Sequence, residues 1–195
     1  KWLIGGQACA AGLLAAEMAA RGTTGMRDIV GGWLPAVSDE THPERLTEGI
    51  AADGTIMQWE LLSGILTKYY ATVGCMTTPL DEIFDLITEN DIKADDIVEI
   101  HVDCMQRLAI FNTRHPENEL GARASLPYCL AVAVCTRDRS QLLGPAFRPE
   151  MLADKAIWAA AEKVRSTVNA DYERQYPARS LARVTLRLHN GKSYS

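Results

Sequence analysis

The stretch IVEIHVDC, residues 97–104, decides the fold class of the second half of the chain. Val98, Ile100 and Val102 alternate with polar side chains along it. Alternation with a period of two is typical of a strand that buries one face. We therefore expect a half-buried strand here, with these three side chains against a core.

Helical patterns lie on both sides of this strand in the sequence. SLPYCLAVAVCTRD, residues 125–138, is largely apolar and begins with Ser125, a favoured N-cap residue. Thr78 is expected to cap a second helix, whose apolar stripe runs to Asn90. A third helix is expected near residues 154–163. Helices and strands in this mixture predict an α+β fold.

Two further strand signals lie at the borders of this region. WELLSGILTKYY, residues 59–70, looks strand-like. ARVTLRLHNGKSYS, residues 182–195, alternates up to Asn190-Gly191, a strong signal for a type I′ hairpin turn. The chain stops shortly after that turn, inside the expected hairpin.

The first element is GQACAAGLLAAEMAAR, residues 6–21, which is rich in good helix formers. It is apolar on almost all sides, which predicts a buried helix. Short helical turns are expected at residues 26–30 and 43–48. Residues 1–57 therefore predict part of an all-helical domain, and residues 58–195 a smaller α+β domain. Because the chain opens inside a helix that needs partners, we expect it to be a piece of a larger soluble enzyme.

Composition excludes several classes of partner. Hydrophobic residues make up 47% of the chain, charged residues 23%, and the net charge is −5, as in a folded globular protein. No block of Lys and Arg is present for a nucleic acid. No apolar run reaches the ~20 residues of a membrane span, and no signal peptide is visible. We expect a cytoplasmic protein with no membrane partner.

The residue types that usually carry chemistry are scattered. The five cysteines form no CxxC pair and predict reduced, structural thiols. The four histidines have no metal-ligand spacing and are interpreted as solvated, so no metal is expected. GGQACAAG, residues 5–12, matches neither GxGxxG nor a P-loop, and no GxSxG occurs.

Two cationic positions remain open. Lys1 precedes the first helix, where it could act as a base, bind a carboxylate, or simply be a frayed terminal residue. Arg123 precedes the helix that Ser125 caps, so it could hold a carboxylate or be solvated.

Five stretches, in order along the chain, resemble the MmgE/PrpD family. They are KWLIGGQACAAGLLAAEMAARGTTG, TKYYATVGCMTTPLDEI, DDIVEIHVDC, ELGARASLPYCLAVAV and RVTLRLHNGKSYS. This family includes 2-methylcitrate dehydratase, cis-aconitate decarboxylase and iminodisuccinate epimerase. The resemblance implies a large helical domain and a smaller α+β lid, usually as a homodimer, with the active site between the two domains.

The resemblance also implies the chemistry. The family acts on small di- and tricarboxylates by proton abstraction next to a carboxylate, without a metal or organic cofactor. Its active-site lysine falls on Lys1. Lys68, Thr77 and Arg123 are then expected to be substrate contacts from the lid, whereas Ser125 and Tyr128 are expected to be structural.

The chain departs from the family pattern at three positions. The functional histidine of the decarboxylase falls on Val73, a later histidine falls on Thr77, and an implicated tyrosine falls near Ala109. Decarboxylation of cis-aconitate is therefore disfavoured. Two functions stay open: a dehydratase, decarboxylase or epimerase of another small polycarboxylate, and a non-catalytic member that serves in dimerisation or ligand binding.

Overall fold

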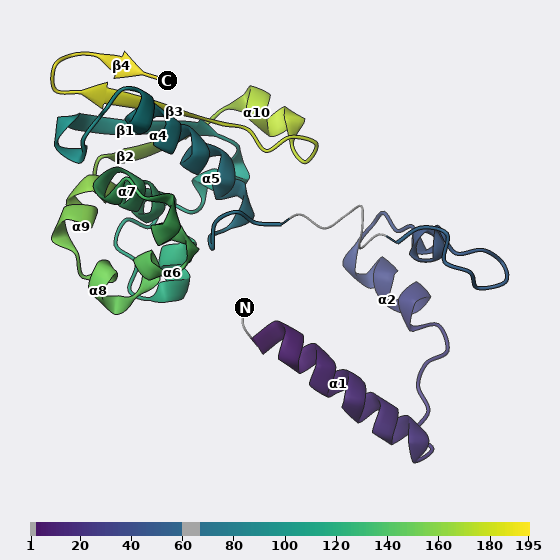
Figure 1. The fold of residues 1–195 in the computed structure, drawn as a ribbon. Coiled ribbons are helices and arrows are strands. Elements are labelled where there is room, and N and C mark those ends of the chain that lie inside the picture. Colours follow the sequence, from purple (N-terminus) through teal and green to yellow (C-terminus); the bar gives the residue numbers. More distant parts are fainter. Residues whose placement is uncertain (1–2, 60–66) are drawn as a thin grey trace. The chain divides into compact units, whose positions relative to one another are not determined.

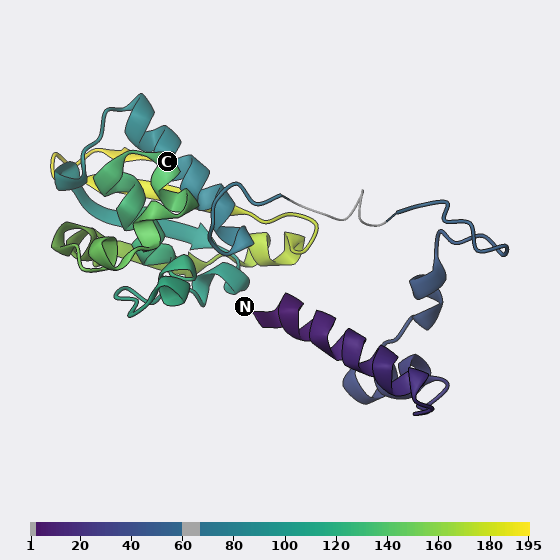
Figure 2. The ribbon, with the colours of Figure 1, turned by 60° about the horizontal axis from the view of Figure 1, so that its bottom comes forward.

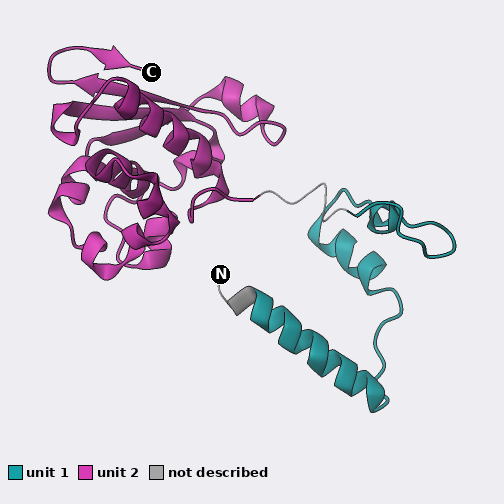
Figure 3. Cartoon of the chain, in the orientation of Figure 1, with its two compact units in different colours: residues 1–65 teal, residues 66–195 magenta. Residues whose placement is uncertain are grey.

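A computed structural model describes residues 3–59 and 67–195. The chain divides into two compact units, residues 1–65 and 66–195 (Figure 3). Element labels follow Figure 1. The described elements mix helices with a four-stranded sheet, so the predicted α+β class is confirmed. The assignment of residues 1–57 to a helical domain and of residues 58–195 to a lid stays a prediction.

Unit 1 contains α1 (Leu3–Ala20), α2 (Ile29–Val37) and the 3₁₀ helix η1 (Pro43–Thr47). The helix expected at residues 6–21 is thereby confirmed. Within this chain no residue from 5 to 59 is buried, so the expected burial of the helix against other parts of a larger protein stays a prediction. Helix α1 is apolar on almost all sides, with Gln7 and Glu17 as its polar residues, and no second layer covers it within the described residues of unit 1.

Unit 2 holds the sheet and most of the helices. Its strands are β1 (Ile97–Cys104), β2 (Val164–Val168), β3 (Ala182–Leu188) and β4 (Ser193–Tyr194). Its α-helices are α4 (Thr77–Glu89), α5 (Gln106–Ala109), α6 (Glu119–Arg123), α7 (Leu126–Thr136), α8 (Pro149–Leu152), α9 (Lys155–Ala161) and α10 (Ala170–Gln175). Its 3₁₀ helices are η2 (Gly74–Met76), η3 (Ala94–Asp96), η4 (Arg139–Leu143) and η5 (Pro145–Phe147).

The sheet has the order β2-β1-β3-β4. Strand β1 runs parallel to β2 and antiparallel to β3, and β4 returns antiparallel to β3. Helix α4 packs on β3, α7 packs on β2, and the two helices pack on each other. Both therefore cover the same face of the sheet (Figures 1 and 2).

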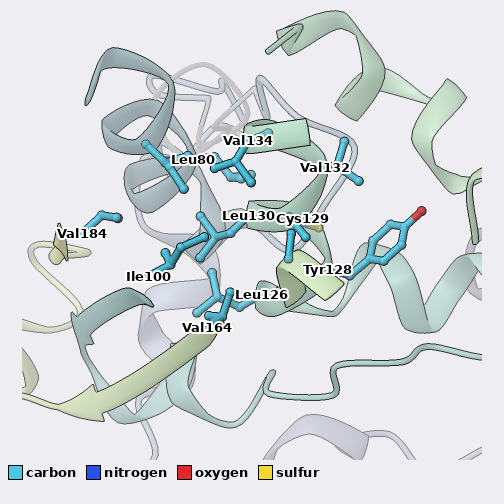
Figure 4. Packing of buried hydrophobic residues seen from close by; sticks show 14 of the residues in the cluster. Leu80, Ile100, Leu126, Tyr128, Cys129, Leu130, Val132, Val134, Val164 and Val184 are labelled. Carbon is cyan, nitrogen blue, oxygen red and sulfur yellow. The ribbon is translucent and has the colours of Figure 1, made fainter. Parts of the chain in front are cut away.

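The core of unit 2 lies between this face and the two helices. Figure 4 shows Leu126, Leu130 and Val134 of α7, spaced four residues apart, on the side that faces Leu80 and Ile100. All five side chains are buried. Helix α7 is also buried on its other sides, as its continuous apolar sequence predicted.

The inward face of β1 differs from the prediction in one residue. Ile100 and Val102 are buried as expected, but Val98 is 48% exposed and Ile97 is buried in its place. The pairing with β3 shifts register between Ile97 and Glu99. Because a one-residue shift moves a side chain to the other face, the irregularity exchanges the two residues.

Of the two predicted N-cap residues, one caps its helix and the other does not. The Ser125 hydroxyl accepts a hydrogen bond from the Tyr128 N–H at 3.0 Å, so it caps α7 as predicted. Thr78 does not cap α4, because the N-cap position is taken by Met76 and the helix already begins at Thr77. The Thr78 hydroxyl instead donates to the carbonyl of Ser180 at 3.1 Å, a tertiary contact that local sequence does not reveal.

The two strand signals at the borders have different outcomes. Of the strand expected at residues 59–70, residues 60–66 lie outside the described residues, and residues 67–70 form no strand. The C-terminal hairpin is confirmed, but its turn is not type I′. Gly191 has a φ of 80°, whereas Asn190 is absent from the described residues with positive φ. A type I′ turn needs positive φ at both central positions.

Candidate functional site

The motif residues from Lys68 to Thr77, here called the Lys68–Thr77 segment, run without strand structure to the start of α4. The Lys68 Nζ donates to the carbonyl of Thr72 at 3.2 Å, which draws the side chain back over its own segment. The segment is also fastened through its backbone. The Ala71 N–H donates to the Leu142 carbonyl at 3.0 Å.

Arg139 of η4 anchors the segment through Tyr70. The Tyr70 hydroxyl donates to Asp81 Oδ1 at 2.6 Å and accepts from Arg139 Nη1 at 2.7 Å. The same arginine donates to Asp81 at 2.8 Å and to Asp85 at 2.5 Å. Its guanidinium lies 4.9 Å from the centre of the Phe84 ring. These contacts join residues that are far apart in sequence into one charge-assisted network.

Tyr70 serves this network as a proton donor. Its side chain is only 1% exposed. Burial, and then the hydrogen bond to Asp81, raises the pKa of Tyr70 above its ordinary value. The phenol therefore stays protonated and fixed at neutral pH, which suits an anchor and not a base.

Arg123 of α6 holds the same segment from another element. Its Nη1 donates to the Ala71 carbonyl at 2.8 Å, and its own carbonyl accepts from the Val73 N–H at 3.2 Å. The guanidinium pairs with Glu119 at 2.7 Å and lies 4.4 Å from the centre of the Phe147 ring. The side chain is 17% exposed. These contacts show how Arg123 supports the segment, and its predicted contact with substrate stays a prediction.

The other predicted site residues fall into two groups. Lys68 is exposed, and Thr77 is partly exposed at the first position of α4. Lys68 bonds to the Thr72 carbonyl and Arg123 to the Ala71 carbonyl, so both contact the Lys68–Thr77 segment, and the predicted contacts of Lys68 and Thr77 with substrate stay predictions. Lys1 lies outside the described residues, so its predicted role in catalysis stays a prediction.

The three positions that depart from the family pattern offer no titratable side chain. Val73 and Ala109 are partly buried and pack against the core of unit 2. Thr77 carries a hydroxyl with no recorded partner among the described residues. Proton transfer by a histidine at these positions is therefore not available to this chain.

Ser125 and Tyr128 hold the fold, as expected for structural residues. Ser125 caps α7 and also donates to the carbonyl of Thr113. The Tyr128 hydroxyl donates to the carbonyl of Ala146 at 2.5 Å. Burial raises the pKa of Tyr128, so it too remains a neutral donor.

His115 has a more defined setting than the sequence predicted. Its ring stacks on Trp158 of α9, with ring centres 4.9 Å apart and planes at 20°. Its Nε2 lies 3.1 Å from Glu162 Oε1. The sequence indicated only a solvated loop histidine. Its ring partner Trp158 lies 43 positions later, so no local pattern revealed the stacking.

The described cysteines form no disulfide bond with one another. Cys104 and Cys129 are buried, as expected of structural thiols, but Cys9 is exposed. Burial raises the pKa of Cys104 from 9.0 to about 11. Within residues 3–59 and 67–195, no three His, Cys, Asp or Glu side chains are grouped to hold a metal ion. No helix of this described part has the length and hydropathy that crossing a membrane requires.

The sequence of the region that forms unit 2 matches a family model. No curated protein matches the chain significantly. The sequence model of the MmgE/PrpD C-terminal domain matches residues 70–195. The match begins at Tyr70 and covers the sheet, its helices and the network around the Lys68–Thr77 segment. The chain therefore belongs to the MmgE/PrpD family.

Proposed function

We propose that this protein acts on a small di- or tricarboxylate by abstracting a proton next to a carboxylate, giving dehydration, decarboxylation or epimerisation. Such chemistry needs a base, and cationic groups that bind the substrate and stabilise the negative charge that develops. Membership of the MmgE/PrpD family supports the reaction class. The site residues are proposed from the resemblance and from the geometry of the Lys68–Thr77 segment.

The observation that carries the proposal is the support of this segment by two arginines. Arg139 fixes Tyr70, and Arg123 fixes Ala71 and Val73. A loop held in this way presents the exposed Lys68 ammonium in a restricted region, which reduces the entropy lost when it binds an anion. Lys68 is thus a preorganised carboxylate anchor.

The remaining roles follow from chemical type and position. Lys1 is the base or a second anchor. Thr77 donates a hydrogen bond to a substrate oxygen from the start of α4. Arg123 acts mainly through the segment, since its guanidinium already contacts Ala71 and Glu119. The protein works as a homodimer in the cytoplasm, and unit 2 closes over the substrate as a lid.

The test is proton exchange with solvent deuterium, using the protein at its full natural length. The acids tested are 2-methylcitrate, cis-aconitate and iminodisuccinate. Proton NMR follows the loss of signal from the protons on the carbon next to each carboxylate. Lys68→Met, which keeps the length of the side chain and removes its charge, is expected to raise KM about 10- to 100-fold for the acid that exchanges.

Lys192→Met is the matched control, because Lys192 is exposed in the C-terminal hairpin. It is expected to leave exchange unchanged. Unchanged exchange in Lys68→Met would remove Lys68 from the site, and unchanged exchange in Lys1→Ala would remove the role given to Lys1. Absence of exchange with every acid in the panel would contradict the catalytic proposal itself.

A second function is favoured by the packing of Val73. This side chain packs against the core at the position where the resemblance places a functional histidine of the decarboxylase, so the lid lacks that histidine. A non-catalytic member of the family would still bind a polycarboxylate or serve in dimerisation. Calorimetric titration separates the two functions: binding of an acid that shows no exchange supports the non-catalytic one.

A further inference from the structure

Unit 2 contains a pocket of about 700 Å³ that the proposed function does not use. It is formed by residues 115–119, which lead into α6, together with Phe147, Leu152 of α8 and Trp158 of α9. Every lining residue belongs to unit 2, so the pocket is complete within one described unit. Its volume is in the range of small-molecule sites, roughly 300–1,000 Å³.

The pocket has aromatic and aliphatic walls. Phe147 is buried, and Trp158 keeps 37% of its surface exposed although His115 stacks on it. Leu152 and Pro149 add aliphatic surface from α8. Such walls favour a ligand with an apolar body, and the face of an indole ring also attracts cations.

Among the described residues, the charges around the pocket leave one carboxylate without a partner. The lining holds Glu117 and Glu119 but no Lys or Arg. Glu119 is neutralised by Arg123 at 2.7 Å. Glu162, beside the pocket, already pairs with His115 at 3.1 Å. Glu117 has no recorded ion pair or hydrogen bond of its side chain among the described residues.

This arrangement selects the charge of the ligand. A polycarboxylate would bring like charge to Glu117, and the lining offers it no Lys or Arg, which disfavours it. A ligand with one positive charge would neutralise Glu117 and contact the indole of Trp158 at the same time. The pocket therefore differs in chemistry from the proposed polycarboxylate site.

We propose that the pocket formed by residues 115–119, Phe147, Leu152 and Trp158, here called the Trp158 pocket, binds a monovalent organic cation that carries an ammonium group on an apolar or aromatic body. Glu117 is the counter-ion, and Trp158 and Phe147 contact the body. This inference does not rest on the proposed enzymatic function, because its test measures binding alone.

The experiment compares three probes of similar size and different charge: phenethylammonium, 2-phenylethanol and 3-phenylpropionate. The full-length protein is labelled with 5-fluorotryptophan, and the resonance of Trp158 is assigned with Trp158→Phe. Phenethylammonium is expected to shift this resonance saturably, with an association constant about 5-fold or more above that of 2-phenylethanol. The anion is expected to bind most weakly.

Glu117→Gln tests the counter-ion while keeping the shape of the side chain. It is expected to lower the affinity for phenethylammonium to that for 2-phenylethanol. Glu150→Gln is the matched control, because Glu150 is an exposed carboxylate of α8 outside the lining. Equal affinity for the cation and the anion, an unchanged affinity in Glu117→Gln, or no shift with any probe would each overturn the proposal.

Discussion

Helices α1 and α7 are both apolar, but within this chain the side chains of α7 are buried and those of α1 are exposed. Every residue of α7 from Leu126 to Val134 is buried. In α1, Leu13 is 71% exposed and Leu14 is 58% exposed. The difference lies in the layers around each helix, since a sheet and other helices pack on α7. An apolar helix becomes part of a core only where a second layer covers it.

The largest expected effect is a difference in folding between the two units. Residues 67–195 expressed alone are expected to unfold cooperatively on heating, because this region contains its own core. Residues 1–59 alone are expected to show no transition, because none of residues 5–59 is buried. Differential scanning calorimetry checks both. A cooperative transition in residues 1–59 would end the comparison.

A matched pair of leucines sharpens the comparison at single residues. Leu130→Ala removes a side chain that is 0% exposed and is expected to lower the free energy of unfolding by about 2–5 kcal/mol. Leu13→Ala, in α1, is expected to change it by less than about 0.5 kcal/mol. Urea unfolding of the full chain gives both values. Equal losses would show that α1 is covered in solution.

The thiols give the next effect, in reactivity. At pH 8, iodoacetamide is expected to modify the exposed Cys9 about 100-fold faster than Cys104, by mass spectrometry of the peptides. Burial raises the pKa of Cys104 to about 11, so its thiolate forms only as the pH approaches that value. The difference in modification rate between Cys9 and Cys104 should therefore become smaller as the pH rises.

The same raised pKa has a consequence for stability. A thiol that burial keeps neutral contributes stability below its ordinary pKa of 9.0, and this contribution is lost as the pH rises toward 11.

Unfolding in guanidinium chloride is the control for the labelling experiment, since it should make Cys9 and Cys104 equally reactive. Fast labelling of Cys104 in the folded protein at pH 8 would contradict its burial.

Two adjacent tyrosines provide the smallest expected effect. Tyr70→Phe removes the hydroxyl that joins Arg139 to Asp81 and is expected to lower the free energy of unfolding by about 1–2 kcal/mol. Tyr69→Phe is the control, because Tyr69 is 63% exposed. Urea unfolding checks both. If the two substitutions have the same effect, the network around Arg139 does not stabilise unit 2.

Much of the fold could be predicted from local sequence. The alternation of residues 97–104 gave β1 with its observed bounds, and Ser125 marked the start of α7. Strand β2 was missed, because VRSTV shows no clear alternation of apolar and polar residues. It forms a strand by pairing parallel to β1. Tertiary contact overrode the local signal at Thr78, whose hydroxyl bonds to Ser180.

The candidate site was only partly predictable. The motif around Lys68 and Arg123 pointed to the segment that the structure supports from several sides. Arg139 was missed, because an arginine in a polar loop usually lies in solvent and its partner Tyr70 is 69 residues away. The Trp158 pocket was also missed, because its walls come from four separate stretches of chain that only the fold brings together.

The sequence by itself determined the family, the α+β class and the identity of the longest helices and β1, because periodicity and caps act between residues close in the chain. Only the tertiary structure decided what covers α7, which face Val98 takes, and how Arg139 and Arg123 each hold the Lys68–Thr77 segment. These outcomes depend on packing and hydrogen bonds between distant stretches, whose energies no local pattern contains.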